Sequence, residues 1–351
     1  MVNLMVTIKD IAKIAGVSPT TVGNVLHGRT KKVSPETLDK VNKVINDTKY
    51  VANMGAKVLT NSGSRIIGVI MNYSRREDIN AIKDPFYGEI IGALEKEIRE
   101  KGYFMMLYTS ADVEESLKMA SAWNIEGLVV LGCSWEDCVK FKENTTIPVV
   151  SIDSYFSGVE EKDMEYINVG LQDFFGAYEM TNYLISEGHR KIAFLADEKY
   201  PVGVDKERFE GYKKALRENN IEFHNSYYIP LSYKKNIRHL ELKNFGGEKL
   251  NEFTALFFAS DFYAVDAMNI FQDNNIKVPE DISIVGFDNN IFSEQCRPKL
   301  TTVEQKVSEK ALYAVKQLMF LIKKEPLEKK NIHLPVKLVI RDSVKNLKGN
   351  N

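Results

Sequence analysis

The residues whose types and spacing could do chemistry fall into two groups. In the first, GVSPTTVGNVLHG (16–28) places Ser18 and Pro19 at the start of a short helix, followed by Thr20, Thr21 and, one turn later, Asn24. Hydroxyl and amide groups on one helix face can bind phosphates or base edges. In the second, polar residues follow apolar runs of strand length; they are Asn72, Tyr73, Asp153, Ser260, Asp261 and Asp288. Ligands of open α/β sheets bind beyond the carboxyl ends of the strands, so this second group predicts a small-molecule site.

The sequence holds no signature of an enzyme active site. No strand is followed by Gly-x-Gly-x-x-Gly, and neither a phosphate-binding Gly-Lys-Ser/Thr loop nor a Gly-x-Ser-x-Gly elbow occurs. The five histidines lack metal-binding spacing. His189, in EGHRKIAF, is interpreted as a structural side chain at a helix-to-strand turn, because no nucleophile lies near it in sequence. We therefore expect no enzymatic activity, no cofactor and no metal.

Three short helices are predicted to carry the first group. A capping pair, Thr7 and Asp10, precedes a helix that ends at Gly16, and a second helix runs from Pro19 to about Leu26. The same Ser-Pro start signal announces a third helix. Two short helices joined by a tight turn are typical of a helix-turn-helix, whose second helix enters the DNA major groove. The residues expected on the inner faces are Ala12, Ala15, Val22, Val25, Leu38, Val41, Val44 and Ile45.

The charge distribution favours a polyanion as the partner of this head. Residues 1–65 carry ten Lys and Arg against four Asp and Glu, a net charge of +6, whereas the rest of the chain carries −7. A local excess of positive charge is typical of nucleic-acid binding. The alternative, a three-helix fold used for protein contacts, leaves this positive charge unexplained.

Composition indicates a globular chain that is too long for one ordinary core. With 351 residues, 44% hydrophobic and 27% charged, two or three domains are expected. No apolar run approaches the roughly 20 residues that span a bilayer, and no secretory signal precedes Lys9, so we expect a cytoplasmic protein with no membrane partner. The three cysteines show no metal-ligand spacing and are expected to be reduced thiols; they are Cys133, Cys138 and Cys296.

From Arg65 onward, apolar runs of strand length alternate with amphipathic helical stretches. The runs are RIIGVIM, YFMMLYT, GLVVLG, PVVSID, KIAFLAD, ALFFAS and ISIVGFD, and the helical stretches include YGEIIGALEKEIREKG, GAYEMTNYLISEGH, RFEGYKKALRENN and DFYAVDAMNIFQDNN. This alternation predicts βαβ units and parallel sheets. We therefore predict an N-terminal all-α helix-turn-helix head, followed by an α/β core of two doubly wound parallel-sheet subdomains.

The order of these segments resembles the lactose/galactose-repressor family of bacterial transcription regulators over nearly the whole chain. The motifs that carry the resemblance are TIKDIAKIAGVSPTTVGNVLHG, YVANMGAKVL, DPFYGEIIGALEKEIREKGY, EGLVVLG, IPVVSID, LISEGHRKIAFL, RFEGYKKAL, ASDFYAVDAM, VPEDISIVGFDN and KLTTVEQ. The resemblance implies a DNA-binding head, a hinge helix, and a core like that of periplasmic sugar-binding proteins, whose subdomains close over a small molecule. It also implies a homodimer that binds double-stranded operator DNA and an effector, foremost a carbohydrate or sugar phosphate, with a nucleobase or a phosphoprotein co-regulator as the alternatives.

The resemblance divides the chain into a helix-turn-helix domain (1–49), a hinge (50–63) and an effector-binding and dimerisation core (64–351). Within the core, the first subdomain is expected at about 64–164 and 292–325. The second is expected at about 165–291 and 326–345.

The resemblance also assigns DNA contacts. Leu59 stands where relatives wedge a leucine between base steps of the minor groove and kink the DNA. Relatives usually have Ser-Arg where this chain has Gly23 and Asn24; an amide suits adenine rather than guanine, so an operator shifted towards A·T is expected at that position. We hypothesise that Gly23 permits a closer backbone approach to phosphate. The expected DNA contacts are Thr7, Ser18, Pro19, Thr20, Thr21, Asn24, His27, Arg29, Asn53, Ala56, Lys57 and Leu59.

For the effector, the resemblance places Arg208 of R-x-E-G-Y and Asp288 of VGFD at the ligand. Ser260 stands where relatives have Asn, which weakens an amide-type contact there. Phe86 and Tyr87 stand where relatives line the cleft with aromatic rings, with packing of helix against sheet as the alternative. The expected ligand-binding residues are Tyr73, Phe86, Tyr87, Asp153, Arg208, Ser260, Asp261 and Asp288.

Two segments, 72–84 and 232–250, fit no family motif. We expect them to be solvated loops, with a role in shaping the effector site as the alternative.

Two functions fit these observations. The first is a dimeric repressor whose head binds operator half-sites and whose core senses a small molecule. The second is a solute-binding protein or enzyme of the same core fold that uses its head for anchoring. The helix-turn-helix and the lack of a signal peptide favour the first.

Overall fold

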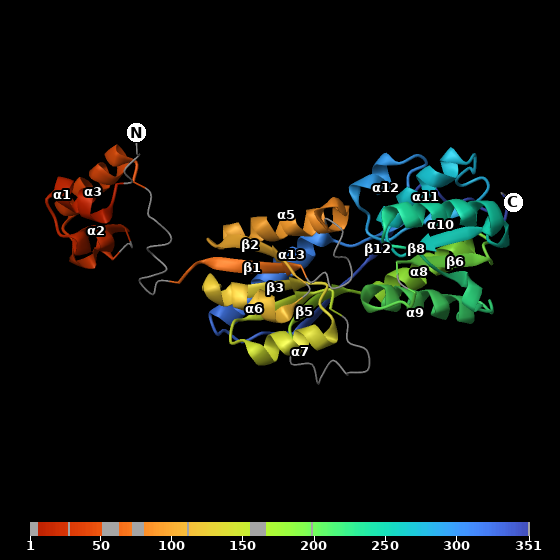
Figure 1. The fold of residues 1–351 in the computed structure, drawn as a ribbon, viewed down its shortest axis with the longest axis horizontal. Coiled ribbons are helices and arrows are strands. Elements are labelled where there is room, and N and C mark those ends of the chain that lie inside the picture. The colour runs from red at the N-terminus through yellow and green to blue at the C-terminus, as the bar shows by residue number, and fades with distance from the viewer. Residues whose placement is uncertain are drawn as a thin grey trace. The chain divides into compact units, whose positions relative to one another are not determined.

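The structure, a computed structural model, describes residues 6–26, 29–50, 63–71, 81–110, 112–154, 166–197 and 199–349. The chain divides into two units, residues 1–64 and residues 65–351, which Figure 1 draws as a group of helices and as a larger α/β core. The predicted hinge (50–63) falls almost wholly outside the described residues. None of the described helices combines the length and hydrophobicity that a membrane crossing requires.

The first unit contains the three helices that the sequence predicts: α1 (Ile8–Ala15), α2 (Pro19–Leu26) and α3 (Pro35–Thr48), with a 3-10 turn at Thr30–Lys32. The capping pair is confirmed, because the Thr7 hydroxyl accepts a hydrogen bond from the Asp10 N–H and the Asp10 carboxylate accepts one from the Thr7 N–H. Gly16, at φ +64°, ends α1 in the left-handed conformation that glycine adopts without strain.

A small apolar core joins these helices. Its buried members come from all three helices and are Ile11, Ala12, Ala15, Val22, Val25 and Val41. Leu38, Val44 and Ile45 of α3 pack against them, as the spacing predicts. The remaining positions of α1 and α2 are therefore free to carry polar residues at the surface.

The first sheet of the core has six strands in the order β11-β5-β4-β3-β1-β2, all parallel. The strands are β1 (Ile66–Met71), β2 (Phe104–Thr109), β3 (Gly127–Leu131), β4 (Val149–Ile152), β5 (Asn168–Leu171) and β11 (Asn331–Leu334). One face is covered by α5 (Pro85–Glu100) and α13 (Val307–Ile322), and the other by α6 (Val113–Ala122) and α7 (Trp135–Asn144), as Figure 1 shows. Covering both faces explains why the strands are continuous apolar runs.

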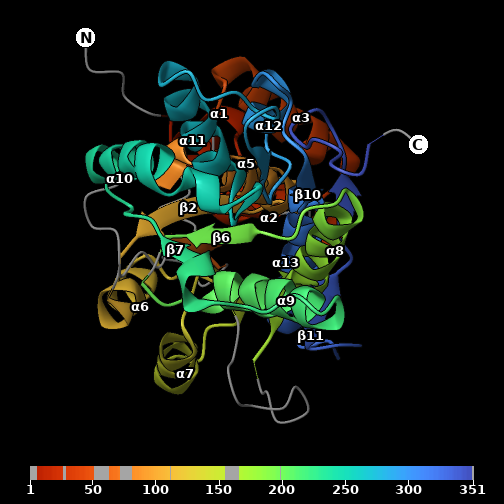
Figure 2. The same ribbon diagram turned by 90° about the vertical axis from the view of Figure 1, so that its right-hand side faces the viewer.

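The second sheet has four parallel strands in the order β7-β6-β8-β9. They are β6 (Ile192–Ala196), β7 (Tyr228–Pro230), β8 (Ala255–Phe258) and β9 (Ser283–Val285). In Figure 2, α9 (Gly203–Glu218) lies on one side of β6, and α10 (Lys235–Glu248) and α11 (Asp261–Asp273) lie on the other. The helix α8 (Asp173–Ser186) packs beside α9, and α12 (Ile291–Gln295) packs beside α11. A separate antiparallel pair joins β10 (Thr302–Glu304) to β12 (Lys337–Val339).

Strand pairing corrects the expected boundaries between the two halves of the core. The resemblance assigned 165–291 and 326–345 to the second half, but β5 and β11 pair in the first sheet. It assigned 292–325 to the first half, where α13 does pack, but Val303 of β10 is buried in the cluster beneath α8 and α9. Which sheet accepts a strand depends on hydrogen bonds to distant segments, and local pattern does not encode those.

Segment 232–250 is likewise not a solvated loop. It contains α10, which buries Leu242 and Phe245 against α11 and the second sheet, and Arg238 is 2% exposed. The apolar positions of α10 are spread among charged residues, which hid the helix in the sequence pattern. Of segment 72–84, the structure describes only a 3-10 turn at Ala81–Lys83 and Asp84, which caps α5.

Candidate DNA-binding and effector sites

The exposed end of α2 carries the first group of candidate residues. The Ser18 hydroxyl accepts a hydrogen bond from the Thr21 N–H at 3.0 Å, so Ser18 caps the helix. Ser18, Pro19 and Thr20 are exposed, and Thr21 and Asn24 are half-buried. Since Val22 and Val25 hold the opposite face in the core, α2 presents hydroxyl and amide groups outward, the arrangement that reading a groove requires.

Gly23 lies on this helix in open space. A Cβ atom built there would meet no atom within 4 Å outside its own helix neighbourhood. Packing within the head therefore does not require a glycine, and its close approach to phosphate stays a prediction. Thr7 and Arg29 are also exposed, at the start of α1 and just after α2. Five predicted DNA contacts lie outside the described residues: His27, Asn53, Ala56, Lys57 and Leu59.

In the core, a chain of buried polar side chains connects the carboxyl end of β4 with the end of β9. Lys310 Nζ of α13 lies 2.9 and 2.7 Å from the two carboxylate oxygens of Asp153 and 2.8 Å from Gln305 Oε1. Gln305 Nε2 in turn donates to Asp288 Oδ1. Lys310 is fully buried, so these side-chain partners take the place of water around its amino group. Burial raises the pKa of Asp153, and the Lys310 ammonium opposes that shift.

Arg208 on α9 forms a second buried ion pair. Its Nε and Nη2 both lie 2.8 Å from Asp173 Oδ1, and Nη1 donates to the Ala259 carbonyl oxygen at 2.6 Å. The guanidinium carbon lies 3.7 Å from the centre of the Phe287 ring. Arg208 is 4% exposed, and the neighbouring carboxylates raise its pKa despite the burial. The structure thus places Arg208 near the strand ends, where it also cross-links α8, α9 and the end of β8.

Asp288 occupies a constrained position after β9. Its φ of +142° is unusual for a residue with a side chain. Hydrogen bonds from Gln305 Nε2, from the Ser260 hydroxyl at 3.0 Å and from the Asp261 N–H at 3.3 Å hold its carboxylate. Burial and the negative charge of Asp261 raise its pKa well above the ordinary value.

Asp261, directly after Ser260, points into the protein. Its carboxylate accepts hydrogen bonds from the Asn290 N–H at 3.1 Å and from the Thr302 hydroxyl. It is fully buried, and burial raises its pKa to about 7. Asp261 therefore braces the strand ends, while Ser260 donates to Asp288 and caps α11 through the Phe262 N–H.

The aromatic pair begins α5. The Phe86 and Tyr87 rings meet edge to face at 5.2 Å, and both pack against the core of the first half. Lys310 Nζ lies 5.1 Å from the centre of the Phe86 ring, so Phe86 belongs both to the packing and to the buried polar chain. Tyr73 lies outside the described residues.

Sequence reasoning missed three members of this cluster: Asp173, Gln305 and Lys310. The sequence pattern could have identified Lys310, because it shares the buried face of α13 with Val307, Ala311 and Ala314. A lysine buried there without a partner would be costly. No sequence pattern identified Asp173, because its partner Arg208 lies 35 residues further along the chain. His189 is structural, as expected: its ring nitrogens contact the Thr254 hydroxyl and the Lys345 carbonyl oxygen, each at 3.0 Å.

Comparison with known proteins decides the family. Residues 7–53 match the family described as bacterial regulatory proteins, lacI family, and residues 181–344 match a periplasmic binding protein-like domain. The chain is 32% identical to the HTH-type transcriptional regulator MalR of Clostridium butyricum, over 97% of this chain and 99% of that protein. The chain belongs to the lacI family of bacterial regulatory proteins. It is a transcriptional regulator that binds DNA through its helix-turn-helix head.

Further relatives of this lacI-family regulator share its whole length. The HTH-type transcriptional repressor PurR of Vibrio campbellii is 29% identical over 98% of this chain and 100% of its own. The crystal structure of the lac repressor dimer bound to operator and the anti-inducer ONPF superposes with a TM-score of 0.82 at 25% identity, over 97% of this chain and 99% of that one. The predicted family, fold class and regulatory function are thereby confirmed.

Proposed function

We propose that this regulator represses transcription as a homodimer bound to a twofold operator, and that a carbohydrate bound between the two halves of its core changes its affinity for that operator. The observation that carries the proposal is the buried polar chain from Asp153 through Lys310 and Gln305 to Asp288, together with the outward-facing polar side of α2.

The chemistry of the buried polar chain suits a polyol. Asp153 and Asp288 supply carboxylate oxygens that accept hydrogen bonds from hydroxyl groups, and Lys310 and Arg208 supply donors. The Phe86 ring offers an apolar face beside them. Because these groups pair with protein side chains in the structure, the hydroxyl groups of a bound sugar would have to replace some of these partners. The ligand would thereby change the contacts that connect the two halves, which is how a ligand biases two conformations.

The head supplies the DNA contacts in this proposal. Thr20, Thr21 and Asn24 contact base edges or phosphates in the major groove, and Ser18 holds the helix start in place. The lac repressor dimer bound to operator supports pairing of two copies, since two heads then contact two half-sites. Binding to operator DNA implies a cytoplasmic site of action.

A two-stage experiment tests the proposal. First, the purified full-length chain is screened against a panel of mono- and disaccharides by thermal shift, because a ligand that binds the folded core raises its melting temperature. Next, operator fragments selected from random DNA are used in band-shift assays with and without the sugar that scored. A change in operator affinity of at least about tenfold is expected, a typical coupling between two sites.

Two controls separate the parts of this proposal. Lys310→Met removes the central donor of the polar chain and should abolish the sugar response, whereas Lys316→Met, on the same helix, should leave it unchanged. If no sequence-specific band shift occurs at any sugar concentration, the repressor function is contradicted. If the shift occurs but no sugar alters it, only the effector class is wrong.

A further inference from the structure

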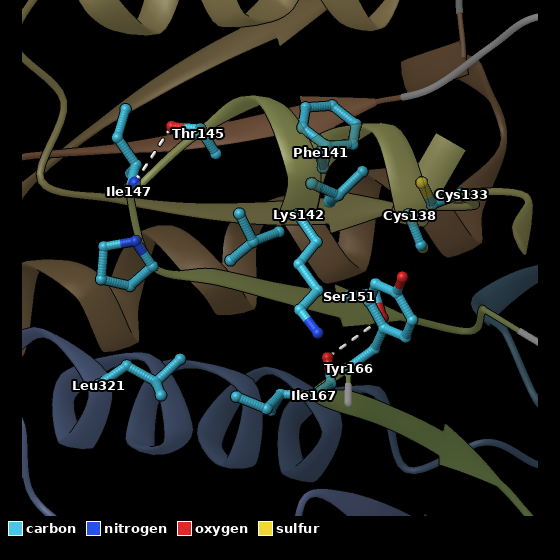
Figure 3. A pocket seen from close by; sticks show the side chains of 13 residues that line it. Cys133, Cys138, Phe141, Lys142, Thr145, Ile147, Ser151, Tyr166, Ile167 and Leu321 are labelled. Carbon is cyan, nitrogen blue, oxygen red and sulfur yellow. Dashed lines mark hydrogen bonds between the residues drawn. The ribbon is translucent and has the colours of Figure 1, made fainter. Parts of the chain in front are cut away.

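A cavity of about 190 Å³ lies in the first half of the core, between α7 and the sheet strands β3 to β5 (Figure 3). Ile147 and Pro148, at the amino end of β4, form part of its wall. Asp153, by contrast, stands at the carboxyl end of β4. The cavity is therefore distinct from the buried polar chain that begins at Asp153, although both use the same strand.

The walls are mostly apolar and aromatic. Phe141 of α7 is buried, and Ile147, Tyr166 and Leu321 contribute half-buried apolar surface. Apolar protein cavities of roughly 150 Å³ can take up a benzene-sized molecule. A cavity of this size therefore suits one six-membered ring with a small substituent. Aromatic walls favour an aromatic ring, which gains edge contacts beyond the burial of its area.

One of the residues that line this cavity, Lys142, is a cation. Lys142 Nζ lies 5.3 Å from the centre of the Tyr166 ring, and Figure 3 shows the ammonium end reaching into the space between Tyr166 and Ile167. Lys142 follows Cys138 by one helical turn on α7, so both side chains face the cavity. An apolar pocket with one convergent charge selects an amphipathic anion.

We propose that this cavity is a second ligand site, which binds a small carboxylate carrying a single aromatic ring. The ring packs among Phe141, Ile147 and Tyr166, and the carboxylate forms a charge-assisted hydrogen bond with Lys142. Benzoate is the simplest molecule of this class.

A lining residue, Ser151, connects the cavity to the strand end that carries Asp153. The Ser151 hydroxyl lies 3.1 Å from Asn168 Oδ1, and the same oxygen accepts a hydrogen bond from the Ser154 N–H at 3.1 Å. Ser154 directly follows Asp153, the partner of Lys310. A ligand that contacts Ser151 therefore acts on the end of β4 that carries the effector-site carboxylate.

Titration calorimetry of the full-length protein tests the site, with benzoate and its neutral counterpart benzyl alcohol as probes. Lys142→Met should weaken benzoate binding by about tenfold and leave benzyl alcohol unaffected, because only the carboxylate uses the charge. The matched control is Lys140→Met, on the same helix but not among the residues around the cavity. Ile147→Trp, which fills the space, should abolish binding of both probes.

Alkylation supplies an independent readout. Cys138 lines the cavity, whereas Cys296 lies outside it, so saturating benzoate should slow alkylation of Cys138 by iodoacetamide and leave Cys296 unchanged. The proposal is overturned if benzoate does not bind at millimolar concentration. It is equally overturned if Ile147→Trp, shown to be folded by circular dichroism, binds benzoate as the natural chain does, because the ligand would then sit elsewhere.

Discussion

The head and the buried polar cluster of the core use polar residues in opposite ways. In the head, the candidate DNA contacts lie on the surface of α2, and an apolar core beneath them holds the helix. In the core, the candidate effector residues are buried or half-buried, and two of them form ion pairs within the fold, Arg208 with Asp173 and Asp153 with Lys310. The candidate binding residues and the residues that stabilise the fold are thus different in the head, whereas in the core they overlap. Substitutions should show this difference directly.

The largest effect is expected for Arg208→Ala. The change leaves the Asp173 carboxylate buried without its cation, which should lower the free energy of unfolding by about 3 to 5 kcal/mol. Both tryptophans, Trp123 and Trp135, belong to the unit of residues 65–351, so their fluorescence during urea denaturation does not report on the head.

Two companions sharpen this test. Lys213→Ala, on the same helix but at its surface, should change stability by less than about 0.5 kcal/mol. The double change of Arg208→Met with Asp173→Leu should recover much of the loss, because no charge then remains unpaired. If Arg208→Ala and Lys213→Ala were equally stable, Arg208 would have no special stabilising role, and this contrast between the head and the core would not hold.

A pH dependence is expected from Asp261. Burial raises its pKa in the folded protein to about 7, against 3.8 in the unfolded chain, so the folded state binds more protons between these values. Its contribution to stability is therefore present at low pH and falls as pH rises, by roughly 2 kcal/mol between pH 5 and pH 8.

Comparison with Asp261→Asn measures this contribution together with the change at Asp288, whose pKa depends on the Asp261 charge; titrating groups remote from Asp261 cancel in the difference. The variant should gain on the natural chain as pH rises from 5 to 8, measured by the midpoint of urea denaturation at each pH. A difference that is flat with pH would mean that Asp261 titrates outside this range.

In the head, Asn24→Ala should change recognition and leave stability alone. The loss of the amide should remove base discrimination at one position of each half-site, at roughly 1 to 2 kcal/mol, or about tenfold. Selection of binding sites from random DNA by both proteins measures it. A strong guanine preference opposite Asn24 in the natural chain would refute the expected A·T preference.

The smallest effect is expected for Gly23→Ala. Since the added methyl group meets open space, the change should stabilise α2 by up to about 1 kcal/mol through the higher helix propensity of alanine. Hydrogen exchange of the α2 amides should slow accordingly. Slower exchange with weaker operator binding would support the close approach of Gly23 to phosphate, whereas unchanged binding would remove that role.

The sequence predicted local structure well and distant pairing poorly. The helices of the head were predictable because Thr7 with Asp10, and Ser18 with Pro19, signal helix starts within a few residues. The strand-length apolar runs were predictable because both faces of the sheets are covered. The placement of β5 and β11 in the first sheet was not, because it depends on partners far along the chain.

The buried polar cluster of the core shows the same contrast between local patterns, which could be predicted, and distant pairing, which could not. Asp153 and Asp288 were found because they follow strands, and Arg208 because its motif resembles that of the family. Lys310 was missed because it pairs with Asp153 across 157 residues. Only the structure shows that Asp153 and Arg208, which were expected to bind effector, already have buried charged partners in Lys310 and Asp173.

The open position at Gly23 has a consequence for how such regulators diversify. A side chain introduced there would project from α2 beside Asn24 without disturbing the packing of the head. After gene duplication, one copy could therefore acquire a different target sequence in a single step and still fold. Gly23, which lowers the stability of α2, is therefore also the position at which a new operator specificity could arise.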